Sequence, residues 1–129
     1  MTRKINHERP KNPNRIYYRF WEHEVWNDET TPLVPVYCNI VDGCDPTVAV
    51  GDFEFCTGVC DKNNQPLFEN DIVEFTAEDG TKYEYQILLA QENLGALLLD
   101  LDSQKAEYFE LGDFDELCLI GTKLGGNIL

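Results

Sequence analysis

Cysteine and histidine are the side chains of this sequence with the widest chemistry, because both can bind metals and both can act in catalysis. They are Cys38, Cys44, Cys56, Cys60, Cys118, His7 and His23. The spacing of Cys56 and Cys60 suits zinc thiolates about two to four residues apart, whereas that of Cys38 and Cys44 does not. A strand through Cys56 would also carry its thiol away from the following turn. We therefore favour reduced thiols, mostly buried as small apolar groups, over a metal centre.

Catalytic patterns are weak at the remaining candidate positions. His23 alternates with charged residues, which is typical of a solvent-facing histidine on a strand. The only serine, Ser103, lies in a turn, so serine-type hydrolysis is not expected. The turns that begin at Asp61 and Asp100 lack the glycine and glutamate that an EF-hand calcium loop requires. We expect no enzymatic activity and no cofactor.

Charge is distributed unevenly along the chain. The formal net charge is −14, from ten basic and 24 acidic residues. Residues 1–26 carry six basic and three acidic side chains, whereas residues 27–129 carry four basic and 21 acidic ones. A domain this acidic repels nucleic acid and attracts basic partners, so we expect a host protein with a basic surface and no direct nucleic-acid contact. The acidity could equally serve solubility alone.

Outward-facing acidic side chains are the ones expected to carry a protein contact. They are Glu69, Glu74, Glu78, Asp79, Glu84, Asp113, Asp115 and Glu116. Such a surface could imitate nucleic-acid phosphate and occupy a basic groove. A metal-dependent nuclease built on the acidic residues near position 115 is a weaker alternative.

Clustered aromatic residues support a second alternative, a module that binds a small nucleotide or metabolite. These residues are Tyr17, Tyr18, Trp21, Trp26 and Tyr37. Their rings could stack on a base, although packing in the core is the more common use of such side chains.

The elements that must position these residues are predicted to be strands. Aromatic and alternating segments fall at residues 16–21, 36–40, 53–57, 71–75, 81–87, 96–101, 106–110 and 117–121. Short strands at intervals of about ten residues predict a mainly β fold with little helix. We expect a small antiparallel barrel or sandwich, for which an SH3-like barrel core is one form.

Individual strands carry more detailed predictions. Asp79-Gly80 is a type I′ hairpin signal, so the strands on either side should pair antiparallel. Tyr83, Tyr85, Ile87 and Leu89 should then share one face. Gly58 should end the strand at residues 53–57, and the apolar run at residues 96–101 should be covered on both faces.

The sequence predicts one domain with an arm and a tail. Residues 1–15 are basic and contain two prolines, so they should form a flexible arm that is ordered only if something holds it. Residues 16–124 form the β domain and residues 125–129 a C-terminal tail. Since no secretory signal and no apolar run of roughly 20 residues occurs, we expect a cytoplasmic location and no membrane contact.

Residues 55–75 closely resemble the signature of the YopX family of phage and prophage proteins. That signature is a Thr-Gly-x-x-Asp-Lys-Asn-Gly turn followed by an aromatic-Glu-Gly-Asp-Ile-Val strand entry. The matching motif residues are Thr57, Gly58, Asp61, Asn64, Asn70 and Asp71. Residues 19–22 resemble the family's opening Arg-x-Trp-Asp strand, and Ile120-Gly121 resembles its closing Ile-Gly.

The resemblance implies a predominantly β, barrel-like fold and a phage or prophage origin, with no assigned activity. Asn64 and Asn70 stand where the family prefers glycine, a mild change because asparagine tolerates positive φ. Thr122 stands where the family has asparagine.

The motif residues also have a physical interpretation of their own. Asp61 can accept bonds from backbone amides across its turn, and Asp71 can cap the entry to its strand. These are residues that hold a turn together, so the motif indicates a shared scaffold more than an active site.

Overall fold

The computed structural model describes residues 7–12, 17–25, 27–39, 49–89, 96–108 and 116–127. These residues contain no α-helix. The strands are β1 (Tyr17–His23), β2 (Leu33–Asn39), β3 (Val50–Cys60), β4 (Pro66–Phe68), β5 (Asp71–Thr76), β6 (Lys82–Leu89), β7 (Ala96–Asp100), β8 (Ala106–Tyr108), β9 (Leu117–Thr122) and β10 (Gly126–Asn127). The mainly β fold predicted from the sequence is confirmed.

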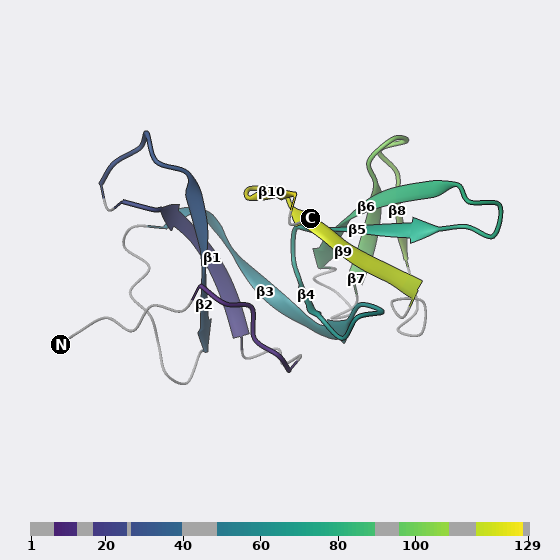
Figure 1. Ribbon diagram of the computed structural model, residues 1–129, viewed down its shortest axis with the longest axis horizontal. Coiled ribbons are helices and arrows are strands. Elements are labelled where there is room, and N and C mark those ends of the chain that lie inside the picture. Colours follow the sequence, from purple (N-terminus) through teal and green to yellow (C-terminus); the bar gives the residue numbers. More distant parts are fainter. Residues whose placement is uncertain are drawn as a thin grey trace.

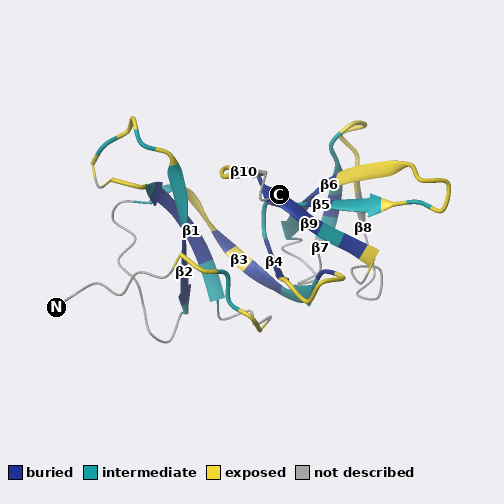
Figure 2. Ribbon diagram, in the orientation of Figure 1, coloured by how far each residue is buried: buried dark blue, intermediate teal, exposed yellow. Residues whose placement is uncertain are grey.

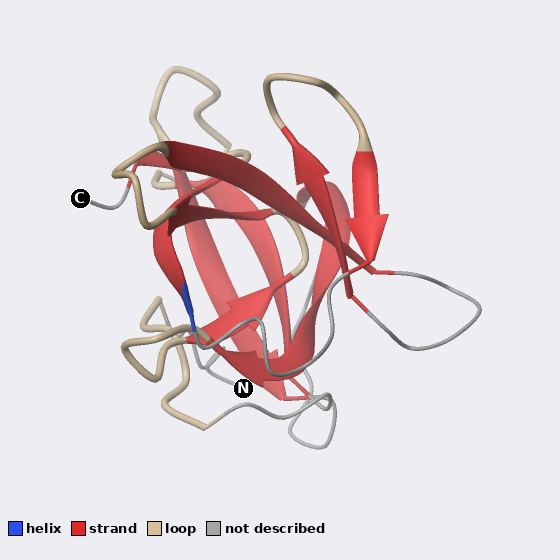
Figure 3. Cartoon of the chain, turned by 90° about the vertical axis from the view of Figure 1, so that its right-hand side faces the viewer, coloured by secondary structure: helices blue, strands red, loops and turns tan. Residues whose placement is uncertain are grey.

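The strands form two antiparallel sheets. The smaller sheet has the order β2-β1-β3-β4, and the larger sheet has the order β10-β9-β5-β6-β7-β8. Figure 1 shows the smaller sheet beside the larger one, which curls into a half-barrel when seen from the side (Figure 3). The architecture is that of a small β barrel or sandwich, as expected.

The β5–β6 hairpin pairs as predicted, but its turn is of another type. Thr76 lies opposite Lys82, the Ala77 amide donates to Thr81 O, and the Gly80 amide donates to Ala77 O. Gly80 has a φ of 88°, whereas Asp79 does not have a positive φ. The turn is therefore type I followed by a glycine bulge, rather than type I′, which needs two left-handed residues.

Gly58 bends β3 instead of ending it. The strand continues to Cys60, and its pairing with β4 shifts register between Cys56 and Cys60. Gly58 has a φ of 85°, a backbone conformation that glycine adopts without steric cost. The prediction that the strand stops at Gly58 is wrong because a left-handed glycine can also form a bulge within a strand.

Two other predictions, the start of β2 and the burial of β7, are corrected by the positions of these strands in their sheets. β2 begins at Leu33 and includes Pro35, which a strand tolerates here because β2 is at the edge of its sheet. In β7 Leu98 is fully buried, while Leu97 and Leu99 are of intermediate burial. The apolar run is therefore covered fully on the face of Leu98 and partly on the opposite face, which is less than the expected cover on both faces.

The core is made by apolar residues that alternate along the strands. The main cluster contains Leu67, Val73, Tyr85, Ile87, Leu98, Leu117 and Leu119. Smaller clusters lie under the first sheet, around Phe20 and around Phe68. Figure 2 shows buried backbone in β1, β4 and β9 and an exposed β5–β6 tip. Tyr85 and Ile87 face the core together, as the alternation in β6 predicted.

Candidate functional site

A buried ion network joins the smaller sheet to the start of β5. Arg19 on β1 is fully buried; its Nε lies 2.7 Å from Glu54 Oε1, and its Nη1 lies 2.7 Å from Asp71 Oδ1. The indole of Trp21 donates to the same Glu54 oxygen at 2.6 Å. Arg19 also donates to Glu69 O at 2.8 Å. One arginine thus connects β1, β3 and the turn before β5.

The charge of Arg19 is stabilised despite its burial. Burial by itself would lower the pKa of Arg19, but the carboxylates of Asp71 and Glu54 outweigh that effect and raise the pKa above its usual range. Arg19 therefore stays charged, and the planar guanidinium satisfies two carboxylates at once.

Arg9 brings the N-terminal arm into this network. Its Nη1 lies 2.6 Å from Asp71 Oδ2 and its Nη2 lies 3.0 Å from Asp71 Oδ1. Nη1 also donates to Pro66 O at 2.8 Å, and the guanidinium carbon lies 5.5 Å from the centre of the Phe68 ring. The arm was expected to be ordered only where something holds it; the Arg9–Asp71 pair is such an anchor.

Asn70 extends the network toward the larger sheet. Its Nδ2 donates to Glu54 Oε2 at 2.7 Å, and its Oδ1 accepts from Gln86 Nε2 at 2.8 Å. Asn70 has a φ of 66°. The asparagine therefore supplies two hydrogen bonds that the glycine favoured by the YopX family could not make.

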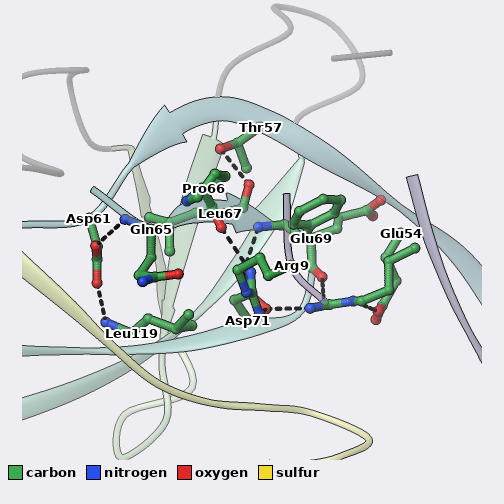
Figure 4. A network of polar contacts seen from close by, with 12 residues as sticks. Arg9, Glu54, Thr57, Asp61, Gln65, Pro66, Leu67, Glu69, Asp71 and Leu119 are labelled. Atoms are coloured by element: carbon green, nitrogen blue, oxygen red, sulfur yellow. Dashed lines mark hydrogen bonds and ion pairs between the residues drawn. The ribbon is translucent and has the colours of Figure 1, made fainter. Parts of the chain in front are cut away.

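Asp61 organises a second, separate turn. Its Oδ1 accepts from the amides of Asn63 and Gln65 at 2.9 and 2.8 Å, and its Oδ2 accepts from the amide of Leu119 at 2.8 Å (Figure 4). Asp71 likewise accepts from the Phe68 amide at 2.7 Å. These contacts are the backbone bonds that the sequence indicated for both aspartates.

The other motif residues also serve the backbone. The Thr57 hydroxyl donates to Leu67 O at 2.9 Å, and Asn64 has a φ of 61°. Gly121 pairs with Ile72 at the point where β5 and β9 shift register. The motif thus builds turns and strand entries, and its buried carboxylates are saturated by donors of the protein itself.

The predicted acidic residues do not all lie together. Glu74 on β5 lies directly opposite Glu84 on β6, so both side chains point to the outer face of the larger sheet. Glu74, Glu78 and Glu116 line one recess of about 400 Å³ beside Lys62. We call Glu74, Glu78, Glu84 and Glu116 the acidic face.

Two of the predicted acidic residues, Asp79 and Glu69, bond to the backbone and are not part of the acidic face. Asp79 Oδ1 accepts from the Thr81 amide at 2.9 Å, and the bonds to Thr81 lower the pKa of Asp79. Glu69 lies near β3, where it accepts from the Phe55 amide at 3.2 Å. Burial raises the pKa of Glu69, and the neighbouring Glu54 charge adds to that rise. Asp113 and Asp115 lie outside the described residues.

The cysteines depart in part from the expectation of five reduced thiols. Cys38 is disulfide-bonded, whereas Cys56, Cys60 and Cys118 are free thiols. Cys38 lies near the end of β2 and is buried in the cluster around Phe20. Burial raises the pKa of Cys60, with a smaller contribution from Cys56. Across the described ranges, no three His, Cys, Asp or Glu side chains gather into a candidate metal site.

A cavity of about 530 Å³ lies between the two sheets. Trp21 and Tyr37 line it from the smaller sheet, and Leu119 lines it from β9. Both rings are buried, at 2% and 7% exposure, so packing is their main use, as expected. Trp26 lies outside the described residues. The cavity and the acidic face are two distinct features of the described surface.

No protein-family model matches this chain, and no curated protein matches it either. In the part of the chain that the structure describes, no helix is long and apolar enough to cross a membrane.

The sequence patterns predicted no ionic role for Arg9, Arg19 or Glu54, and Arg19 entered only through the resemblance of residues 19–22 to a family strand. Arg19 and Glu54 occupy strands whose apolar neighbours made them resemble ordinary alternating polar positions. The available signal was an arginine at a position flanked on both sides by aromatic residues, Tyr18 and Phe20. Such a position is costly for a charge unless a partner lies within the fold.

Proposed function

We propose that this protein is a YopX-like accessory protein of a phage or prophage that binds a basic host protein in the host cytoplasm and catalyses no reaction. The observation that carries the proposal is the acidic face, where Glu74 and Glu84 stand directly opposite each other on neighbouring strands. The resemblance of residues 55–75 to the YopX signature supports the phage or prophage origin.

Opposed glutamates are not explained by stability. Like charges directly across two strands destabilise the pair, and here Lys82 offers Glu74 only a loose contact of 3.7 Å. Lys82 is 65% exposed, so water screens that ion pair strongly. A repulsive pair on a regular strand surface therefore favours a use outside the fold, namely attraction of a positively charged partner.

The acidic face is suited to imitate nucleic-acid phosphate. Its carboxylates sit on paired strands of a sheet, so their spacing is held by the backbone instead of by flexible loops. With a net charge of −14, the whole protein adds long-range attraction toward a basic groove. A nuclease, polymerase or defence factor that binds nucleic acid would present such a groove.

The remaining carboxylates support binding over catalysis. Asp71 is held between Arg9 and Arg19, and Asp61 accepts three backbone amides. The oxygens of these two carboxylates already accept hydrogen bonds from the protein itself. Their role is therefore to stabilise turns. The carboxylates of the acidic face carry no such bonds from backbone amides in the described structure, and a partner can reach them on the outer face of the larger sheet.

Capture from host lysate at low and moderate salt tests this proposal. The tagged protein should retain a nucleic-acid-binding protein at low salt, and added nucleic acid should release it. Capture should weaken as salt rises, because exposed charges are screened within about 8 Å at physiological ionic strength. A partner retained equally at both salt concentrations, or one that nucleic acid does not displace, would argue against phosphate mimicry.

A further inference from the structure

We infer that the cavity between the sheets is a second binding site, distinct from the acidic face, for an uncharged planar heterocycle of nucleobase or nucleoside size. Its volume of about 530 Å³ lies within the range of roughly 300–1,000 Å³ typical of small-molecule sites. Its walls belong to both sheets, so the space is a slot between two strand layers.

The walls of the slot are apolar and aromatic. Trp21, Tyr37 and Pro35 line it from the smaller sheet. Trp21 is 2% and Tyr37 7% exposed, so each ring contributes only a small part of its surface to the wall. Leu119 lines the cavity from β9. A planar ring system suits a space between two strand layers, because its two faces can make dispersion contacts with both layers at once.

The side chains of Arg9 and Asp61 in the lining already have hydrogen-bonding partners. Arg9 directs two nitrogens to Asp71, and one of them also reaches Pro66 O. Both oxygens of Asp61 accept backbone amides. A phosphate would find the Arg9 guanidinium already paired with Asp71, and an ammonium group would find both oxygens of Asp61 occupied by backbone amides. Neither charged side chain offers a free partner, so the site favours a neutral ligand.

Neutral polar groups supply the remaining hydrogen-bonding capacity. The side-chain amide of Gln65 has no partner among the described residues, and the imidazole of His7 uses one ring nitrogen on Pro35 O at 2.7 Å. Asn63 keeps its amide oxygen free while its nitrogen makes a long contact to Cys118 Sγ at 3.6 Å. Groups that both donate and accept match the alternating edge of a nucleobase.

The N-terminal arm forms part of the wall, through His7 and Arg9. A ligand in the slot should therefore stabilise the docked arm, because the complete lining exists only while the arm is in place. This coupling predicts slower amide exchange at residues 7–12 when the site is filled.

Fluorescence titration of the full chain tests the inference. Trp21 and Trp26 are the only tryptophans, so Trp26→Phe isolates the emission of Trp21. Adenosine, cytidine, guanosine and uridine, each with its 5′-monophosphate, serve as probes, and ligand-observed NMR on the unsubstituted chain provides a second readout. We expect saturable binding of at least one nucleoside, with its monophosphate binding no more tightly. Failure of all four nucleosides in both assays, or a monophosphate that binds at least tenfold more tightly, would overturn the inference.

Two single substitutions locate the site. Gln65→Ala keeps the backbone amide that Asp61 holds and should weaken nucleoside binding about five- to tenfold. Glu116→Gln on the acidic face should leave nucleoside binding unchanged, and Gln65→Ala should leave capture of the basic partner unchanged. Nucleoside binding that is insensitive to Gln65→Ala, or sensitive to Glu116→Gln, would refute this cavity as the site without bearing on the proposed function.

Discussion

At the scale of single residues, the buried charged side chains of the described structure form ion pairs that hold its strands together. Arg19, Glu54 and Asp71 are each no more than 2% exposed, and each lies in contact with an opposite charge. A buried ion pair gains little net stability over apolar packing, but removal of one partner leaves an uncompensated charge in the interior. The network therefore restricts β1, β3 and the start of β5 to an arrangement in which Arg19 contacts both carboxylates.

Arg19→Met should destabilise the fold strongly, because it leaves the buried Glu54 without its cation and leaves Asp71 with Arg9 alone. The expected loss is about 3–5 kcal/mol of unfolding free energy, measured by urea denaturation. Arg9→Met is the matched control, since Asp71 then keeps Arg19 as a partner, and its loss should be clearly smaller. Equal losses for the two variants would contradict the central position of Arg19.

Glu69→Gln should raise the melting temperature near neutral pH and have a smaller effect at about pH 4. Burial raises the pKa of Glu69 in the folded state, so its ionisation works against folding as pH increases through that range. Glutamine keeps an oxygen that can accept from the Phe55 amide. Thermal melts of both proteins across this pH range provide the measurement; a stabilisation that is largest in acid would have the wrong sign.

At the scale of elements, left-handed residues decide where strands bend and end. Gly58 and Gly80 form bulges, while Asn64 and Asn70 take positive φ in the turns between strands. The two asparagines differ in what their side chains do. The side chain of Asn70 forms hydrogen bonds with Glu54 and Gln86, whereas Asn64 donates only its backbone amide, to Asp61 O.

Substitution of each asparagine by glycine should give different losses of unfolding free energy. Asn64→Gly keeps the left-handed backbone at little cost, so we expect a change below about 1 kcal/mol in unfolding free energy. Asn70→Gly removes two partly buried hydrogen bonds and leaves polar groups of the network unpaired, for a loss of about 1–3 kcal/mol. Chemical denaturation of both variants makes the comparison. A larger loss at Asn64 than at Asn70 would be inconsistent with this assignment of roles.

The sequence predicted the elements better than the contacts between them. The strand class and the β5–β6 pairing follow from local alternation, and the bonds of Asp61 and Asp71 follow from turn chemistry. The continuation of β3 through Gly58 depends on its pairing with β4, which local sequence does not specify. The Arg19–Asp71 pair joins residues 52 positions apart, and the Arg9–Asp71 pair joins residues 62 apart, so no spacing could reveal them.

At the scale of the whole molecule, two surfaces have different chemistry. The outer face of the larger sheet gathers carboxylates, while the slot between the sheets is apolar with neutral polar groups. Of the predicted acidic residues, Glu74 and Glu84 are brought together because paired strands place opposite residues on one face. Glu78 and Glu116 line the recess beside Glu74. Glu69 is separated from them because it follows β4 and turns back toward β3.

The most direct test of the proposed function compares two variants that lose the same charge. The first changes Glu74, Glu78, Glu84 and Glu116 to glutamine, which neutralises the acidic face. The second neutralises four described acidic residues elsewhere, by Glu24→Gln, Glu29→Gln, Asp52→Asn and Asp102→Asn. Both variants remove four negative charges, so a difference between them reports the location of charge and not its total.

Titration calorimetry of each variant with the purified basic partner is the decisive measurement. The account predicts that the face variant binds at least tenfold more weakly than the unsubstituted protein and shows a shallower salt dependence, while the control variant changes affinity by less than about threefold. Equal weakening by the two variants would mean that total charge alone drives the interaction. That result, or undiminished binding by the face variant, would contradict the assignment of the acidic face as the binding surface.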